Sequence, residues 1–140
     1  MSKIAVIYFT NTGNTEAIAE LVAEGAQDKG AETELFEADG FTAADAADFD
    51  AFALGCPACG TEELDEDTFV PLLDEIEPEL AGKPVVLFGS YGHGGGAYQD
   101  DWKDRETEAG LKVLGTLAIL EYPTDEADIE AAKELGAKLA

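Results

Sequence analysis

Basic residues are scarce in this sequence. It has 8 Lys and Arg against 31 Asp and Glu, which gives a formal net charge of −23 over 140 residues. Nucleic acids are bound through clustered Lys and Arg that neutralise phosphates, so the composition excludes nucleic acid as a partner and disfavours anionic membrane surfaces. An acidic surface instead favours docking onto basic patches of partner proteins, because attraction between opposite charges accelerates their encounter. High solubility, or a host that lives in high salt, is the alternative explanation of this composition.

Long hydrophobic runs and a cysteine framework are also missing. No segment approaches the roughly 20 apolar residues that a membrane-spanning helix needs, and the run Ile4–Ile7 is too short for a signal peptide. Cys56 and Cys59 are the only cysteines, which excludes a disulfide scaffold. These features predict a cytoplasmic protein with no membrane association. The length and the 46% hydrophobic content predict one globular domain over residues 1–140.

Apolar runs of strand character alternate with segments of helical periodicity along the whole chain. The predicted strands are Lys3–Phe9, Thr33–Phe36, Ala51–Leu54, Val85–Phe88 and Leu111–Leu120. The predicted helices are Thr15–Lys29, Thr42–Phe49, Asp65–Ile76, Asp100–Ala109 and Asp125–Leu139, the last capped by Asp125. This alternation predicts an α/β protein with a central parallel sheet, helices on both faces and right-handed crossovers.

Ligands of open parallel sheets bind beyond the carboxyl ends of the strands, so the loops after the first, third and fourth strands are the candidate site. The first loop offers hydroxyls, amides and a helix N-terminus, which together favour an anion; it comprises Thr10, Asn11, Thr12, Gly13, Asn14 and Thr15. It has no Lys and does not match the Walker pattern, so it suits a single phosphate better than nucleoside triphosphate hydrolysis. An ordinary helix cap is the alternative interpretation.

The other two loops, Gly55–Glu62 and Gly89–Tyr98, are rich in glycine and in apolar or aromatic residues. They are long enough to hold a flat ring between them. The second loop also contains Cys56-Pro57-Ala58-Cys59, so a redox-active dithiol is an open alternative. The third loop loosely matches a dinucleotide fingerprint, but the segment Gln99–Ala109 after it is polar and charged instead of an apolar helix packing on the sheet.

With these three loops in this order, the sequence resembles the short-chain flavodoxins. T-N-T-G-N-T is similar to the family's phosphate loop, G-C-P-A-C-G-T-E to its inner flavin loop and F-G-S-Y-G-x-G to its outer one. The resemblance covers the whole chain and implies a flavodoxin-like sheet of five parallel strands in the order 2-1-3-4-5. It also implies non-covalent FMN that cycles between semiquinone and hydroquinone in a monomeric, low-potential one-electron carrier. Such a carrier has no substrate turnover of its own and passes electrons from reductases to low-potential acceptors.

The resemblance assigns roles to individual residues as well. The first loop would bind the FMN phosphate, and the inner face of the flavin would be lined by Pro57, Ala58 and Cys59. The Gly60–Thr61 peptide would turn on reduction so that its carbonyl accepts from flavin N5–H, and Glu62 would accept from N3–H. The outer loop would comprise Ser90, Tyr91, Gly92, His93 and Gly94, with Tyr98 near the ring edge. His93 stands where relatives have Trp, and Cys59 where they have Met.

Two function classes remain at this point. A pure electron carrier is favoured because no catalytic acid, base or nucleophile accompanies the flavin loops, apart from His93. The alternative is an FMN-dependent NAD(P)H:quinone-type reductase of the same fold, which usually carries insertions and oligomerises to complete a substrate pocket. Trp102, on a predicted helix, is interpreted as a core residue.

Overall fold

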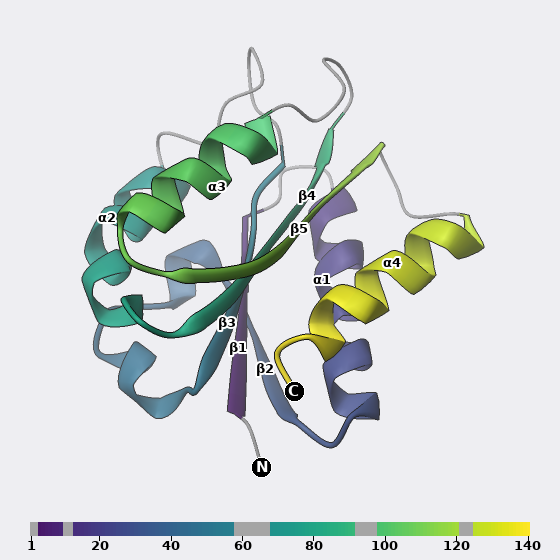
Figure 1. Ribbon diagram of the computed structural model, residues 1–140, viewed down its shortest axis with the longest axis horizontal. Helices are drawn as coiled ribbons and strands as arrows, with labels where there is room; N and C mark the ends of the chain where they lie inside the picture. Colours follow the sequence, from purple (N-terminus) through teal and green to yellow (C-terminus); the bar gives the residue numbers. More distant parts are fainter. Residues whose placement is uncertain (1–2, 10–12, 58–67, 92–97, 121–124) are drawn as a thin grey trace.

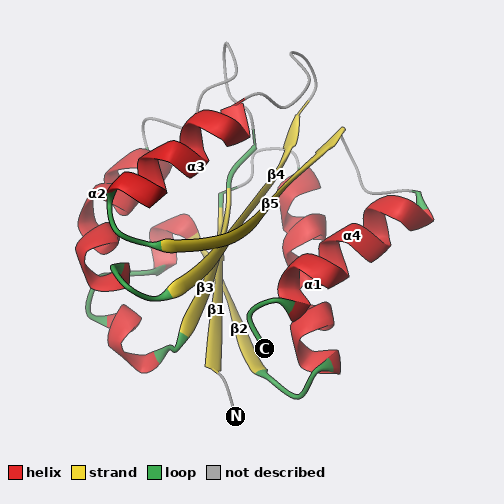
Figure 2. Ribbon diagram, viewed as in Figure 1, coloured by secondary structure: helices red, strands yellow, loops and turns green. Residues whose placement is uncertain are grey.

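The computed structural model describes residues 3–9, 13–57, 68–91, 98–120 and 125–140. A parallel sheet lies between two layers of helices (Figures 1 and 2). Its strands are β1 (Lys3–Tyr8), β2 (Glu32–Glu37), β3 (Ala51–Gly55), β4 (Pro84–Tyr91) and β5 (Lys112–Leu120), in the order β2-β1-β3-β4-β5. The helices are α1 (Asn14–Asp28), α2 (Phe69–Leu80), α3 (Tyr98–Glu108) and α4 (Glu126–Ala137). The predicted fold class and strand order are therefore confirmed.

The central strands β1, β3 and β4 are largely apolar because helices cover both of their faces, whereas the edge strand β2 is polar and more exposed. Alternate residues of β1 show this: Ile4 and Val6 belong to the core packed under α1 and α4, whereas Ala5 and Ile7 belong to the core packed under α2 and α3. All four side chains are fully buried. Among the described residues, no helix has both the length and the apolar character needed to cross a membrane.

The predicted helix at Thr42–Phe49 is wrong. Two short 3-10 turns, Ala38–Gly40 and Asp45–Asp48, connect β2 to β3 instead. Both the amide and the hydroxyl of Thr42 donate to Asp45 Oδ2, each at 3.1 Å. These local bonds compete with a regular helix. The connection is held in place by Phe41 and Phe49, which follow the two turns and are buried in the core.

The end of α2 also differs from the sequence prediction. Helix α2 continues beyond Ile76 through Pro78 to Leu80, because Leu80 lies one turn after Ile76 and buries the same face. Its predicted start at Asp65 lies outside the described residues. Asp125 is the N-cap residue of α4, as predicted, but its side chain makes no capping hydrogen bond.

Helices α1 and α4 approach each other through glycine. A Cβ on Gly25 would lie 2.0 Å from the carbonyl oxygen of Lys133, and one on Gly136 would lie 1.8 Å from that of Val22. No side chain fits in either place, so the two helices touch backbone to backbone. An ion pair of 3.2 Å between Lys133 Nζ and Glu24 Oε1 joins the same two helices.

We expect Gly25→Ala to lower the free energy of unfolding by about 1–3 kcal/mol, the usual cost of overpacking. The sign is informative, because alanine in a helix interior is otherwise about 1 kcal/mol better than glycine. Urea unfolding would measure the change. Gly40→Ala is the control, since a Cβ there meets nothing within 4 Å, and it should stay within about 0.5 kcal/mol of the native protein. A Gly25→Ala protein as stable as the native one would contradict the backbone contact.

Candidate functional site

The candidate site lies at the carboxyl edge of the sheet, where β1, β3 and β4 end and α1 and α3 begin (Figure 1). The described parts of the three predicted loops are Gly13–Thr15, Gly55–Pro57, Gly89–Tyr91 and Tyr98. The other predicted site residues lie outside the described residues: Thr10, Asn11, Thr12, Ala58, Cys59, Gly60, Thr61, Glu62, Gly92, His93 and Gly94.

The N-terminus of α1 has the features of an anion site. Gly13 is its N-cap residue, with a left-handed φ of 88° and no side-chain capping hydrogen bond. The first amides of a helix have no acceptor within the helix and carry the positive end of its dipole. A Cβ on Gly13 would meet no atom within 4 Å, so the space beside this helix end is open.

Tyr8, which sequence reasoning did not single out, anchors the first turn of α1. Its hydroxyl donates to Glu16 Oε2 at 2.9 Å, linking the end of β1 to that turn. Burial, together with the hydrogen bond to Glu16 and its negative charge, raises the pKa of Tyr8 to about 12. Tyr8 is therefore a neutral donor that holds the Glu16 carboxylate at a fixed place.

Two buried hydroxyls bring the first and third predicted loops together. Thr15 Oγ1 lies 3.2 Å from Ser90 Oγ, although the two residues are 75 positions apart in the sequence. Thr15 is fully buried, and Ser90 is 4% exposed. The sequence predicted both residues as site residues, and the structure places their hydroxyls in contact.

Tyr98 lies in the core, between the ends of β3 and β4. It is 2% exposed, and its hydroxyl lies 2.9 Å from the carbonyl oxygen of Cys56 and 3.4 Å from that of Ser90. Gln99 Nε2 donates to the same hydroxyl at 3.2 Å. Sequence reasoning placed Tyr98 at the site but missed Gln99, because no motif signals that the side chain following Tyr98 turns back to its hydroxyl.

The described part of the Cys-x-x-Cys segment does not favour a reactive thiol. Cys56 is fully buried, and its Sγ donates to the carbonyl oxygen of Pro57 at 3.4 Å. Reactive cysteines are instead partly exposed and lie in electropositive surroundings. Cys56 therefore fits the role of a small core residue at the end of β3.

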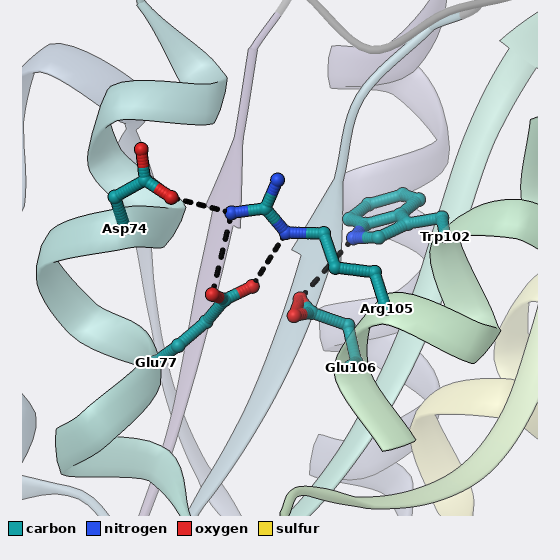
Figure 3. Close-up of polar contacts among 5 residues, drawn as sticks. All are labelled: Asp74, Glu77, Trp102, Arg105 and Glu106. Carbon is teal, nitrogen blue, oxygen red and sulfur yellow. Dashed lines mark hydrogen bonds and ion pairs between the residues drawn. The ribbon is translucent and has the colours of Figure 1, made fainter. Parts of the chain in front are cut away.

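A second polar cluster joins α2 to α3, away from the loops (Figure 3). Arg105 donates from Nε to Glu77 at 2.8 Å and from Nη2 to Asp74 at 2.7 Å. The hydrogen bond to Glu77, the largest influence, raises the pKa of Arg105 above its usual value. These ion pairs hold the two helices of one layer side by side.

Glu106, in the same cluster, is a fully buried acid that the sequence analysis did not identify. Its Oε2 accepts from Trp102 Nε1 at 3.2 Å, while its Oε1 has no hydrogen-bond partner within the described part of the chain. Burial, and secondarily the neighbouring Glu77, raises the pKa of Glu106 to about 9. Glu106 is therefore protonated at neutral pH. Trp102 is 1% exposed, which confirms it as a core residue.

Comparisons with known proteins agree with this fold. Residues 6–136 match the family model described as flavodoxin. The flavodoxin of Megasphaera elsdenii is 37% identical over 96% of this chain and 98% of its own length, and that of Clostridium beijerinckii is 36% identical over 96% and 97%. The solution structure of the two-electron reduced Megasphaera elsdenii flavodoxin superposes with a TM-score of 0.89 over the same 96% and 98%. A flavodoxin from the domain Archaea, 26% identical, gives 0.88 over 99% of this chain and 96% of that one.

The raised pKa of Glu106 predicts that part of the stability falls as pH increases. Between about pH 4.5 and about pH 9 the unfolded chain loses this proton while the folded protein keeps it. The unfolded state then binds fewer protons, so the free energy of unfolding decreases by up to about 1.4 kcal/mol for each pH unit. We expect Glu106→Gln to remove this dependence, so that its stability relative to the native protein grows from pH 5 to pH 8 in urea unfolding. Glu108→Gln, an exposed control on the same helix, should show no such trend. A constant difference between Glu106→Gln and the native protein would mean that Glu106 is ionised when folded.

Proposed function

The chain belongs to the flavodoxin family, and we propose that the residues at the carboxyl edge of its sheet hold FMN as the carrier's redox group. The protein is an FMN-binding electron carrier without substrate turnover of its own, as its flavodoxin relatives are. Nothing in the comparisons favours the quinone reductase alternative. The chain aligns with 98% of the Megasphaera elsdenii flavodoxin, so both share the same compact α/β unit. We further propose that this unit, residues 1–140, is a single domain and acts as a monomer.

The single observation that carries the proposed site is the N-terminus of α1, which fits the phosphate end of FMN. A Cβ added to its N-cap residue, Gly13, would meet nothing within 4 Å, and the buried Thr15 hydroxyl lies at the same helix end. None of the basic residues is in the first loop. Backbone amides and hydroxyls suffice for one phosphate, whereas a triphosphate generally requires a lysine.

Bound FMN would supply the exchange of single electrons, and the protein would bind and orient it. Thr15 and the first amides of α1 would hold the phosphate, and Ser90 would orient the Thr15 hydroxyl. Pro57 and Tyr91 begin the segments that would flank the ring. The other ring contacts are proposed from the resemblance alone, among them those of Ala58, Cys59, Glu62, His93 and the Gly60–Thr61 peptide.

The distribution of charge supports docking of basic partner surfaces at this same edge. Every one of the 8 basic residues lies at or before a strand start, or in or beyond the middle of a helix; they are Lys3, Lys29, Lys83, Lys103, Arg105, Lys112, Lys133 and Lys138. The first turns of α1, α3 and α4, at the opposite edge, carry the acids Glu16, Asp100, Asp101 and Glu126. A redox enzyme with a basic surface would therefore be attracted to the side at which the flavin is held. We propose such enzymes, as donors and acceptors, in the cytoplasm.

The phosphate site is tested by comparing FMN with riboflavin. We expect the apoprotein to bind FMN much more tightly than riboflavin, with orthophosphate competing for the site. Thr15→Val should weaken FMN binding about tenfold or more, since a hydrogen bond to a charged group contributes about 1.5–3 kcal/mol, and should leave riboflavin binding nearly unchanged. Thr15→Ser keeps the hydroxyl and should retain most of the affinity. Fluorescence titration measures both ligands, and equal binding of the two by the native protein would refute the phosphate site.

The acidic edge predicts that the more negative one-electron potential of the FMN-loaded protein depends on salt. One carboxylate at about 12 Å opposes an added negative charge by roughly 0.5 kcal/mol at an effective dielectric of about 50, or about 20 mV. We expect this potential to become less negative as salt rises from about 0.01 M to about 1 M, because salt screens the repulsion between the carboxylates and the added charge.

A matched pair of variants on α3 tests the same point. Asp101 lies in the first turn and Glu108 at the last residue, and both are exposed. Asp101→Asn should raise the potential by about 10–20 mV, and Glu108→Gln by clearly less, because seven residues of helix add about 10 Å of distance. Potentiometric titration measures these shifts. If the potential did not respond to salt, or if the two variants shifted it equally, the carboxylates would not influence the flavin.

A further inference from the structure

The hydroxyl of Tyr98 lies where two neighbouring strands stop pairing. The last pair between β3 and β4 is Gly55 with Phe88, and just beyond it the amide of Cys56 donates to the carbonyl oxygen of Phe88 at 3.0 Å. Strand β4 goes on, paired with β5 as far as Tyr91. Helix α3 begins with Tyr98 at this same edge (Figure 1). Its side chain thus takes a position beyond the end of the β3–β4 ladder.

At this position the hydroxyl makes contacts that a backbone amide would otherwise provide. It donates to the carbonyl oxygen of Cys56 at 2.9 Å and lies 3.4 Å from that of Ser90. Gln99 Nε2 donates to the hydroxyl oxygen at 3.2 Å, which leaves the Tyr98 proton for the Cys56 carbonyl. Gln99 is 4% exposed, and its Oε1 has no hydrogen-bond partner among the residues described. A buried acceptor without a partner lowers the stability of the folded state. The contact between Gln99 and the Tyr98 hydroxyl is therefore present in spite of this cost.

Gly89 leaves the space that the contact between Tyr98 and Cys56 requires. A Cβ at this position would lie 2.0 Å from the carbonyl oxygen of Cys56 and 2.2 Å from the Tyr98 hydroxyl oxygen. Any other residue at position 89 would displace one of the two. The absence of a side chain on β4 therefore creates the space that the phenol head and the Cys56 carbonyl share.

Resting on the proposed FMN site, we infer that Tyr98 is a positioning residue that fixes the separation of the two flavin loops through its hydroxyl. Cys56 and Pro57 begin the inner loop, Ser90 and Tyr91 lead from β4 into the outer loop, and Tyr98 is the last residue of the segment Gly89–Tyr98 that contains the outer loop. One phenol head thus joins both ends of the outer loop to the base of the inner one. This sets the width of the ring site before FMN enters, and such preorganisation increases affinity.

The test removes only the hydroxyl, in Tyr98→Phe. Ile76→Val is the control: Ile76 is fully buried in α2, and losing one methyl group there destabilises the protein by an amount comparable to the loss of a hydrogen bond. Urea unfolding of both apoproteins would verify that they fold and are comparably destabilised. Fluorescence titration would then give the affinities for FMN and for riboflavin, and potentiometry the two one-electron potentials. Amide hydrogen exchange at Cys56 and Ser90 would report on the apoprotein without any cofactor.

We expect Tyr98→Phe to weaken FMN and riboflavin by the same factor, roughly tenfold, because the loops hold the ring that both ligands share. Its potentials should shift, and exchange at Cys56 and Ser90 should accelerate, while Ile76→Val changes neither. Affinities, potentials and exchange rates in Tyr98→Phe equal to those of Ile76→Val would overturn the inference and reduce Tyr98 to a core residue. If the native protein itself bound no FMN, the proposed function would fail instead, and the exchange data would still decide whether the hydroxyl joins the two loop bases.

Discussion

Burial of the parallel sheet on both faces is the constraint from which the rest of the molecule follows. Strands covered by helices on each side must be apolar, as the two separate cores flanking β1 show. Polar chemistry is thereby confined to the edges of the sheet, and in a parallel sheet all helix N-termini gather at one of them. The proposed anion site at α1, the hydroxyls of Thr15 and Ser90, and the acidic first turns of α1 and α3 lie together for this reason.

The fold and the place of the site were predictable because both depend on local patterns. Apolar runs and helical periodicity predicted a parallel sheet with helices on both faces, and the resemblance to the flavodoxins supplied its strand order. The loops after the first, third and fourth strands indicated the carboxyl edge as the candidate site. Contacts between distant segments were not predictable. Tyr98 meets Cys56 across 42 positions, and Glu106 is buried on a helix whose sequence is strongly polar. The error at Thr42–Phe49 has a local cause, since Thr42 and Asp45 bond to each other instead of to a helix.

The carboxylates of this protein are neutralised in the helix layer but not at the carboxyl edge of the sheet. Arg105 is placed between Asp74 and Glu77, where one cation holds two acids and joins two helices. Glu106, next to it, has no cation of its own and keeps its proton instead. At the carboxyl edge of the sheet, Asp100, Asp101 and Glu126 are exposed to solvent, and Glu16 accepts a hydrogen bond from the Tyr8 hydroxyl. A chain of net charge −23 thus keeps its interior neutral while its reactive end stays negative.

The contact between α1 and α4 has a consequence for how such a protein can diverge. The two helices meet through main-chain atoms at Gly25 and Gly136, so their spacing does not depend on the size of any side chain. The other end of α1 is the terminus that we propose binds the FMN phosphate. The position of α1 along the sheet is therefore fixed by this backbone contact. The surrounding residues can be substituted during evolution without shifting the helix end that is proposed to bind the cofactor. Substitution of either glycine is different, because a Cβ at Gly25 or Gly136 would collide with the backbone of the other helix.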